Sequence, residues 1–315
     1  MSLTEAELEQ HCGFILKRTK IKNKIVVLCE GARSERGEIL SPQLYGKMEQ
    51  FPDADFYSNC IPSYWTQRKP CFFNCGDRND TINTYFKLLE IHNREPEQSN
   101  LSIDLLFALI DIDLNTAEIE DYTFSNTEII FHDLYRDLRV NLDRLSAHRI
   151  WVTGFKHKEA YFINPALQQI FDKYPNPIIY QDVQLKLDAI YRNIVADLSA
   201  DGDLHQHFDK VVKRISHCQE LNCTNPSRLA NSWHQEWEIN KNYRNELVFG
   251  LLAVSPSKPY WEQVHPDENY SRSASEFRNE LYRHIAEEFY AKQDSLSCLD
   301  YHLPCFFRYL YDLVH

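Results

Sequence analysis

The chain has 315 residues and a formal net charge of −12, with 43% hydrophobic and 25% charged residues. This composition is typical of a folded globular protein, excludes a low-complexity chain, and leaves room for one large domain or two ordinary ones. No apolar run approaches the roughly 20 residues that span a bilayer, so the sequence predicts a soluble protein with no membrane partner. Nine scattered cysteines without a signal peptide predict no disulfide framework and favour the cytoplasm.

The acidic charge would repel a polyanion at long range, so nucleic-acid binding would have to depend on local basic patches or bound metal. Two clusters of basic residues meet this need, although each is also typical of an ordinary solvated face. They are Lys17, Arg18, Lys20, Lys22 and Lys24, and Lys156, His157 and Lys158.

The first half alternates between strand and helix patterns. Residues 4–18 predict a helix that begins at Thr4, because Glu7 completes a capping box. Residues 24–30 form a short apolar run, which predicts a strand buried on both faces, and residues 34–51 have helical spacing.

A second strand is predicted at residues 70–75, followed by a helix that Asn79 or Asp80 caps. A third strand over residues 105–110 ends at Asp111 and Asp113. This order of strands and helices predicts a doubly wound, Rossmann-like α/β fold with a mostly parallel sheet and flanking helices.

One more strand is predicted at residues 148–154, and a helix over residues 158–171. Beyond about residue 172 the pattern becomes mainly helical. The predicted domains are therefore 1–172, with its short N-terminal helix, and a helical domain of unassigned role over 173–315. The helical stretches lie at 181–199, 203–222, 230–252 and 273–292.

Three carboxylates stand at the ends of predicted buried strands. Glu30 follows the first strand, and Asp111 and Asp113 close the third. Functional sites of open α/β sheets form at these ends, and a spacing of two residues places both aspartates on one face of an extended chain. Clustered carboxylates repel one another unless a cation lies between them, and Mg²⁺ or Mn²⁺ prefers such ligands. The pattern therefore predicts a divalent-metal site.

The same residues resemble a known family. Val27-Leu-Cys-Glu30-Gly31, then Cys75-Gly76, then Phe107-Ala-Leu-Ile-Asp111-Ile-Asp113 look like the Toprim domain. Downstream, Lys158-Glu159-Ala-Tyr161-Phe-Ile-Asn-Pro165 is similar to a motif of stand-alone OLD-type Toprim nucleases. The resemblance covers about residues 24–170.

The resemblance implies a metal-dependent nuclease that hydrolyses phosphodiester bonds in DNA or RNA. Glu30 would be a metal ligand and general base, Asp111 and Asp113 would hold the metal, and Glu159 would serve a second ion. Lys156 or Lys158 would neutralise charge on the scissile phosphate. Glu35 occupies an acidic position that these proteins often have five residues after the first glutamate, and would support the metal site.

OLD-type proteins usually carry an ATPase with a P-loop, and Gly-x4-Gly-Lys-Ser/Thr does not occur in these 315 residues. The resemblance therefore implies an effector of prokaryotic antiviral defence that a separate ABC-type ATPase partner controls. The aromatic-rich C-terminal end, residues 301–311, is interpreted as core or as a face for a homo-oligomer.

Three other interpretations of the sequence remain open. The first is a catalytically idle Toprim scaffold whose helical half binds a protein, which the acidic charge favours. The second is an unrelated α/β enzyme that acts on a nucleotide or phospho-metabolite. The third is a zinc site at Cys71 and Cys75 with Cys218 and Cys223, although the spacing also fits core cysteines. In addition, Arg278 and His284 match a short ribonuclease pattern that arises easily by chance.

Overall fold

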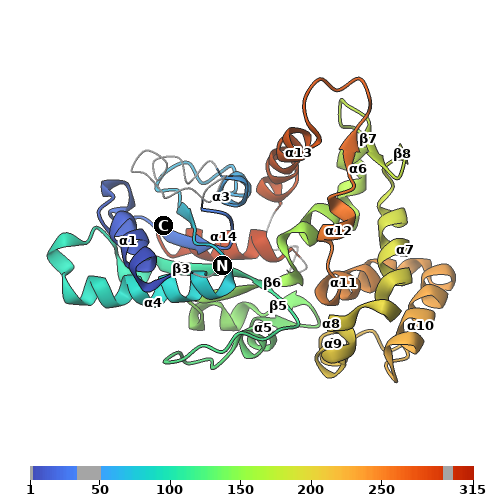
Figure 1. The fold of residues 1–315 in the computed structure, drawn as a ribbon, viewed down its shortest axis with the longest axis horizontal. Coiled ribbons are helices and arrows are strands. Elements are labelled where there is room, and N and C mark those ends of the chain that lie inside the picture. Colours follow the sequence, from blue (N-terminus) through green and yellow to red (C-terminus); the bar gives the residue numbers. More distant parts are fainter. Residues whose placement is uncertain (1–2, 34–50, 294–300) are drawn as a thin grey trace.

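The computed structural model describes residues 3–33, 51–293 and 301–315. A four-stranded parallel sheet with the order β2-β1-β3-β6 lies in the first half of the chain (Figure 1). Its strands are almost fully buried, which agrees with their continuous apolar sequences and confirms the predicted α/β class. The strands are β1 (Val26–Cys29), β2 (Cys71–Asn74), β3 (Leu106–Ile112) and β6 (Ile150–Lys156).

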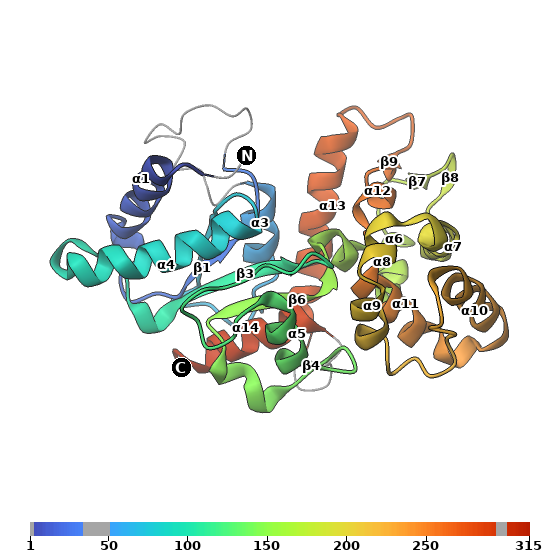
Figure 2. The same cartoon turned by 60° about the horizontal axis from the view of Figure 1, so that its bottom comes forward.

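Helices cover both faces of this sheet. Helices α1 (Glu5–Leu16) and α4 (Arg78–Arg94) pack on each other, and α4 packs on β1 and β3. The opposite face carries the rings of Phe72, Phe107 and Trp151, and all three contact α14 (His302–Asp312), the last helix of the chain. Figure 2 shows α14 returning to lie beside the sheet.

The starts of the two N-terminal helices follow from their capping residues. Thr4 caps α1 and forms the predicted capping box with Glu7. The prediction for α4 was wrong, because Asp77 rather than Asn79 or Asp80 is the cap, and its carboxylate accepts the backbone N–H of Asp80. The helix predicted over residues 34–51 lies almost entirely outside the described residues.

The second half is mainly helical, as predicted. The helix predicted over residues 158–171 is instead three short turns, η6 (Lys158–Ile163), η7 (Pro165–Leu167) and α6 (Gln168–Phe171), because Pro165 forces Asn164 into an extended conformation. The stretch predicted over 230–252 is two helices, α10 (Pro226–Ile239) and α11 (Arg244–Val254). The other α-helices here are α7 (Leu187–Asp197), α8 (Gly202–Gln206), α9 (Phe208–Arg214), α12 (Lys258–Trp261) and α13 (Ala274–Glu288).

Several smaller elements complete the fold. Helices α3 (Pro52–Asn59) and α5 (Thr127–Leu134) pack on β2 and β6 respectively. A hairpin joins β4 (Tyr135–Arg136) to β5 (Arg139–Val140), and a small antiparallel sheet contains β7 (Ile178–Tyr180), β8 (Val183–Gln184) and β9 (His265–Pro266). The remaining 3₁₀ turns are η1 (Thr19–Ile21), η3 (Pro96–Gln98), η4 (Ile103–Leu105), η5 (Leu142–Ala147), η8 (Leu198–Ala200), η9 (Lys241–Tyr243) and η10 (Tyr290–Lys292). Within the described ranges, every helix is too short or too polar to cross a bilayer.

Candidate functional site

Glu30 and Asp111 meet at the carboxyl ends of β1 and β3. These two strands are parallel neighbours, with Cys29 paired to Leu109. The backbone N–H of Asp111 donates to Oε1 of Glu30 at 2.8 Å, and both side chains are partly buried. The Glu30 carboxylate therefore lies against the backbone of Asp111, a residue 81 positions away in sequence, at the carboxyl ends of the two strands.

This pair resists full ionisation. Burial raises the pKa of Glu30 to about 7, and the charges of Asp77 and Asp113 act in the same direction. Burial also raises the pKa of Asp111 well above its usual value, with further contributions from the charges of Glu30 and Glu159. In the absence of a cation, the two carboxylates therefore retain a proton up to near-neutral pH.

Asp113 has different neighbours from Asp111. Its Oδ1 lies 3.8 Å from Nζ of Lys156, a buried residue that also lies 3.9 Å from Oδ2 of Asp203. Burial raises the pKa of Asp113, but the charges of Lys156, His157 and Arg78 outweigh burial and hold that pKa below its usual value. Although the sequence predicts that both aspartates share one environment, Asp113 is the ionised member, and its charge is balanced by protein cations.

A buried arginine from the helical half holds the backbone of Asp113. Arg214 of α9 is fully buried and donates from Nη2 to the carbonyl oxygen of Asp113 at 2.7 Å. It also donates to the carbonyl of Ala253 in α11 and forms an ion pair with Glu128 of α5. The chain just after β3 is therefore fixed by contacts with the second half of the protein.

Lys158 contacts the pair through its backbone and not through its ammonium group. Its N–H donates to Oδ2 of Asp111 at 3.1 Å, whereas its ammonium forms an ion pair with Asp53 of α3. His157, with φ of 63° and ψ of 153°, has a conformation that residues other than glycine rarely adopt, and it joins β6 to the N–H of Lys158 that reaches Asp111. Burial lowers the pKa of the Lys158 ammonium.

Glu159, predicted from the resemblance as a further ligand, is only 8% exposed at the start of η6. Its charge is one of the causes that raise the pKa of Asp111, so it belongs to the same electrostatic group. Glu35, the remaining predicted ligand, lies outside the described residues.

Two side chains near the pair were not predicted from the sequence. Asp53 is buried beside Gly31, where an added Cβ would overlap its carboxylate. Arg78 begins α4, and its charge opposes the raised pKa values of Glu30 and Asp111. Asp53 stands in a helix far from any strand end in sequence, so no spacing signal pointed to it. Arg78 lies two residues after Gly76, in the turn that the Cys75-Gly76 motif marked.

Close approach of two glycine backbones fixes the turn that carries Arg78. Gly31 and Gly76 exchange backbone hydrogen bonds of 2.9 and 3.0 Å, so the residues after β1 and β2 lie side by side. Their φ angles of 147° and 108° lie in the region that favours glycine. The sequence Glu30-Gly31 and the sequence Gly76-Asp77-Arg78 therefore form one edge of the site.

A hydrogen-bonded network from the last helix supports β6 and η6. The imidazole of His302 in α14 lies 3.1 Å from the hydroxyl of Tyr161, which accepts the N–H of Gly154 at 3.0 Å. An added Cβ at Gly154 would overlap the ring of His302, so this position requires glycine. Helix α14 therefore holds in place the segment that carries Lys158 and Glu159.

The donor atoms at this site fit the Mg²⁺ or Mn²⁺ ion that the family resemblance implies. Glu30 and Asp111 offer carboxylate oxygens, the preferred ligands of these ions, and a cation would remove the repulsion between them. Within the described ranges, no group of three or more His, Cys, Asp or Glu side chains is arranged to hold a metal ion without further ligands. Magnesium in proteins is commonly held by one or two carboxylates, with water and substrate phosphates as the other ligands.

Other candidate sites have structural explanations or lie elsewhere. Cys71, Cys75 and Cys218 are buried thiols, and no three His or Cys side chains in the described part of the chain lie together as zinc ligands. Arg278 donates to the carbonyl oxygens of Glu262 and Val264, which accounts for it without catalysis.

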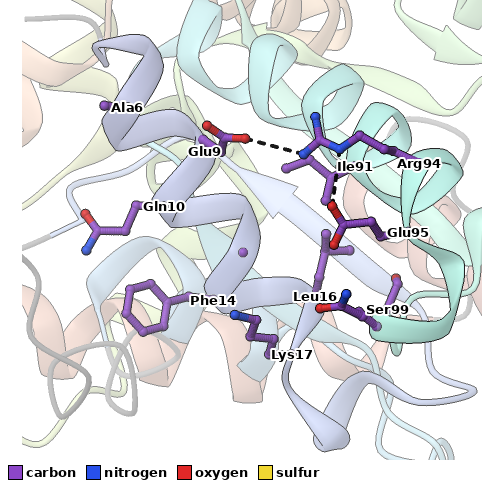
Figure 3. Close-up of a pocket in the computed structure, with 12 residues that line it drawn as sticks. Ala6, Glu9, Gln10, Phe14, Leu16, Lys17, Ile91, Arg94, Glu95 and Ser99 are labelled. Carbon is purple, nitrogen blue, oxygen red and sulfur yellow. Dashed lines mark hydrogen bonds and ion pairs between the residues drawn. The ribbon is translucent and has the colours of Figure 1, made fainter.

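A pocket of about 500 Å³ lies between α1 and the end of α4 (Figure 3). Its lining combines apolar side chains such as Leu16 and Ile91 with the ion pair between Glu9 and Arg94. It includes none of the predicted site residues, and the strand-end carboxylates lie outside it.

Comparisons with known proteins do not assign this site. No protein-family model matches the chain, and no curated protein matches it at a significant level. What the chain does must therefore be argued from its own residues.

Proposed function

We propose that this protein is a divalent-metal-dependent nuclease of the Toprim type, which hydrolyses phosphodiester bonds in DNA or RNA. The observation that carries the proposal is the hydrogen bond from the backbone N–H of Asp111 to the Glu30 carboxylate, which joins two acids of raised pKa at the ends of neighbouring parallel strands. Sites at strand ends are typical of catalytic α/β proteins, and carboxylate pairs that bind Mg²⁺ or Mn²⁺ are typical of phosphoryl transfer.

In this proposal Glu30 and Asp111 hold the ion, which would replace the proton that the pair otherwise retains. A bound divalent ion supplies positive charge to phosphodiester oxygens and activates water for attack on phosphorus. Glu159 adds negative charge beside Asp111 and would strengthen cation binding. The N–H of Lys158 and the N–H of Asp111 orient the two carboxylates.

The test is a cleavage assay on plasmid, single-stranded DNA and tRNA, with Mg²⁺ or Mn²⁺ and with chelator. We expect metal-dependent cleavage of at least one substrate by the wild type, and a loss of about 100-fold or more in Glu30→Gln. Glu287→Gln, which changes an exposed glutamate on α13, is the matched control and should cleave normally. Equal cleavage by Glu30→Gln with an unchanged unfolding midpoint would rule the proposal out.

A second candidate is a catalytically idle scaffold that binds a protein partner. The observation in its favour is that Lys158 and the buried Lys156 already balance Asp53 and Asp113, as protein cations do at sites that need no metal. An idle scaffold need not bind Mn²⁺, so metal titration separates the two proposals. As a nuclease, the protein would fit an antiviral effector that a separate ATPase restrains, because no P-loop motif occurs in these residues.

A further inference from the structure

Arg78 lies beside the carboxylate pair without being bound to it. The backbone bridge between Gly31 and Gly76 places the first turn of α4 next to Glu30. The charge of Arg78 acts on all three strand-end acids, Glu30, Asp111 and Asp113. Its Nε is nevertheless buried and lacks a hydrogen-bond partner in the described part of the chain.

The other cations around the site are engaged. Lys158 forms an ion pair with Asp53, and Lys156 lies between Asp113 and Asp203. The guanidinium of Arg78 makes no ion pair with any residue that the structure describes, although it is close enough to affect the acids. The cap of α4 is already satisfied, because Asp77 accepts the N–H of Asp80. Arg78 is therefore a cation that the fold leaves available at this edge.

We propose that Arg78 binds a phosphate of the nucleic-acid substrate beside the Glu30–Asp111 pair. This inference rests on the proposed nuclease function and names the residue that recognises the backbone of the substrate. A guanidinium presents two parallel N–H groups to phosphate oxygens, which makes arginine the preferred residue for this contact. In a chain with net charge −12, such a local cation is also what allows a polyanion to approach the acids.

Binding is measured by fluorescence anisotropy with 5′-fluorescein-labelled 20-nucleotide single strands of DNA and of RNA, in chelator, over a range of salt. Arg78→Gln should weaken binding about ten-fold or more, and should lower the slope of log affinity against log salt by about 0.7, the loss of one phosphate contact. Arg78→Lys should keep the salt slope while binding more weakly than wild type. In the presence of metal, Arg78→Gln should raise KM.

Arg228→Gln is the matched control, because Arg228 is exposed on α10 and its loss changes the net charge equally. It should leave both affinity and salt slope unchanged. If Arg78 only shields the carboxylates, the Arg78→Gln variant will keep the salt slope of the wild type. That result would overturn the inference.

The two proposals fail differently. Cleavage by the wild type with unchanged KM and binding in Arg78→Gln contradicts the role of Arg78 and leaves the nuclease. Binding that depends on Arg78 without any cleavage supports the phosphate contact and contradicts the nuclease. A wild type that binds neither strand contradicts the role of Arg78, and the cleavage assay on plasmid and tRNA then decides the nuclease independently.

Discussion

A partly buried carboxylate ionises with difficulty, and the charge of Glu30 also raises the pKa of the neighbouring Asp111. The fold accepts this arrangement because the backbone N–H of Asp111 and that of Lys158 each donate to one of the two side chains. Such unfavourable pairs are common at functional sites, where the ligand supplies the missing charge. The raised pKa values of Glu30 and Asp111 are therefore those expected of a site that binds a cation.

This placement predicts a pH-dependent stability for the metal-free protein. Because the pKa of folded Glu30 is raised to about 7, its contribution is fully present below the unfolded value near 4.5 and is lost as the pH rises through 7. In Glu30→Gln this loss disappears. The free energy of unfolding of wild type relative to Glu30→Gln should fall by on the order of 2 kcal/mol between pH 5 and pH 8.

Urea unfolding in chelator at several pH values measures this difference. Glu287→Gln again serves as the control, because an exposed glutamate on α13 should leave the pH profile unchanged. Parallel profiles for wild type and Glu30→Gln would show that Glu30 ionises normally in the folded protein.

The sequence places Glu30 and Asp111 at strand ends, and the structure brings them together. Sequence spacing could not separate Asp111 from Asp113, since their pKa values differ through burial and the charge of Glu30 at Asp111 and through Lys156, from another strand, at Asp113. Asp53 was not predicted, because only the approach of α3 to Gly31 in the folded protein places it at the site. Contacts of this kind depend on tertiary packing and leave no periodic pattern.

At the scale of elements, the helical half takes part in shaping the site through α9. Arg214 joins β3, α5 and α11 because its guanidinium contacts the carbonyl of Asp113, the carboxylate of Glu128 and the carbonyl of Ala253. The pKa of Glu128 is lowered to about 2: burial raises it, but hydrogen bonds from His132 and Arg214 and their charges outweigh burial. The ionised pair is thus maintained at all ordinary pH values.

Removing Arg214 should therefore destabilise the protein more than removing the whole pair. We expect Arg214→Met to cost about 4 kcal/mol, because Glu128 remains largely buried without its partner. The double variant Arg214→Met with Glu128→Leu should recover part of this loss, as measured by urea unfolding. A double variant that is less stable than the single one would contradict a role of the ion pair in holding α9 against α5.

The regular elements near the sheet follow from the sequence, and the interruptions do not. Short apolar runs predicted β1, β2, β3 and β6 within a few residues, because strands buried on both faces must be apolar throughout. The boundary between α10 and α11 was missed, since residues 230–252 keep a helical pattern of apolar residues across the break. The two-residue strands β4, β5, β8 and β9 are too short to show a period.

In the molecule as a whole, the last helix of the chain packs against the sheet that the first half forms. The predicted division at residue 172 remains a prediction, but α14, from the far end of the second half, covers the aromatic face of the sheet (Figure 2). The same helix supports Gly154 and Tyr161 through His302, so the candidate site depends on residues from both ends of the chain. The aromatic C-terminal end, interpreted as core or as an oligomer face, supplies core residues here.

We propose that Glu30 and Asp111 together hold a divalent cation. Isothermal titration of the chelator-treated protein with Mn²⁺ at pH 7, in two buffers of different ionisation enthalpy, tests it most directly. We predict saturable binding that releases about one proton, since the ion displaces the proton of the pair, and loss of this binding in Asp111→Asn. No saturable Mn²⁺ binding by the wild type, or equal binding by Asp111→Asn, would contradict the claim.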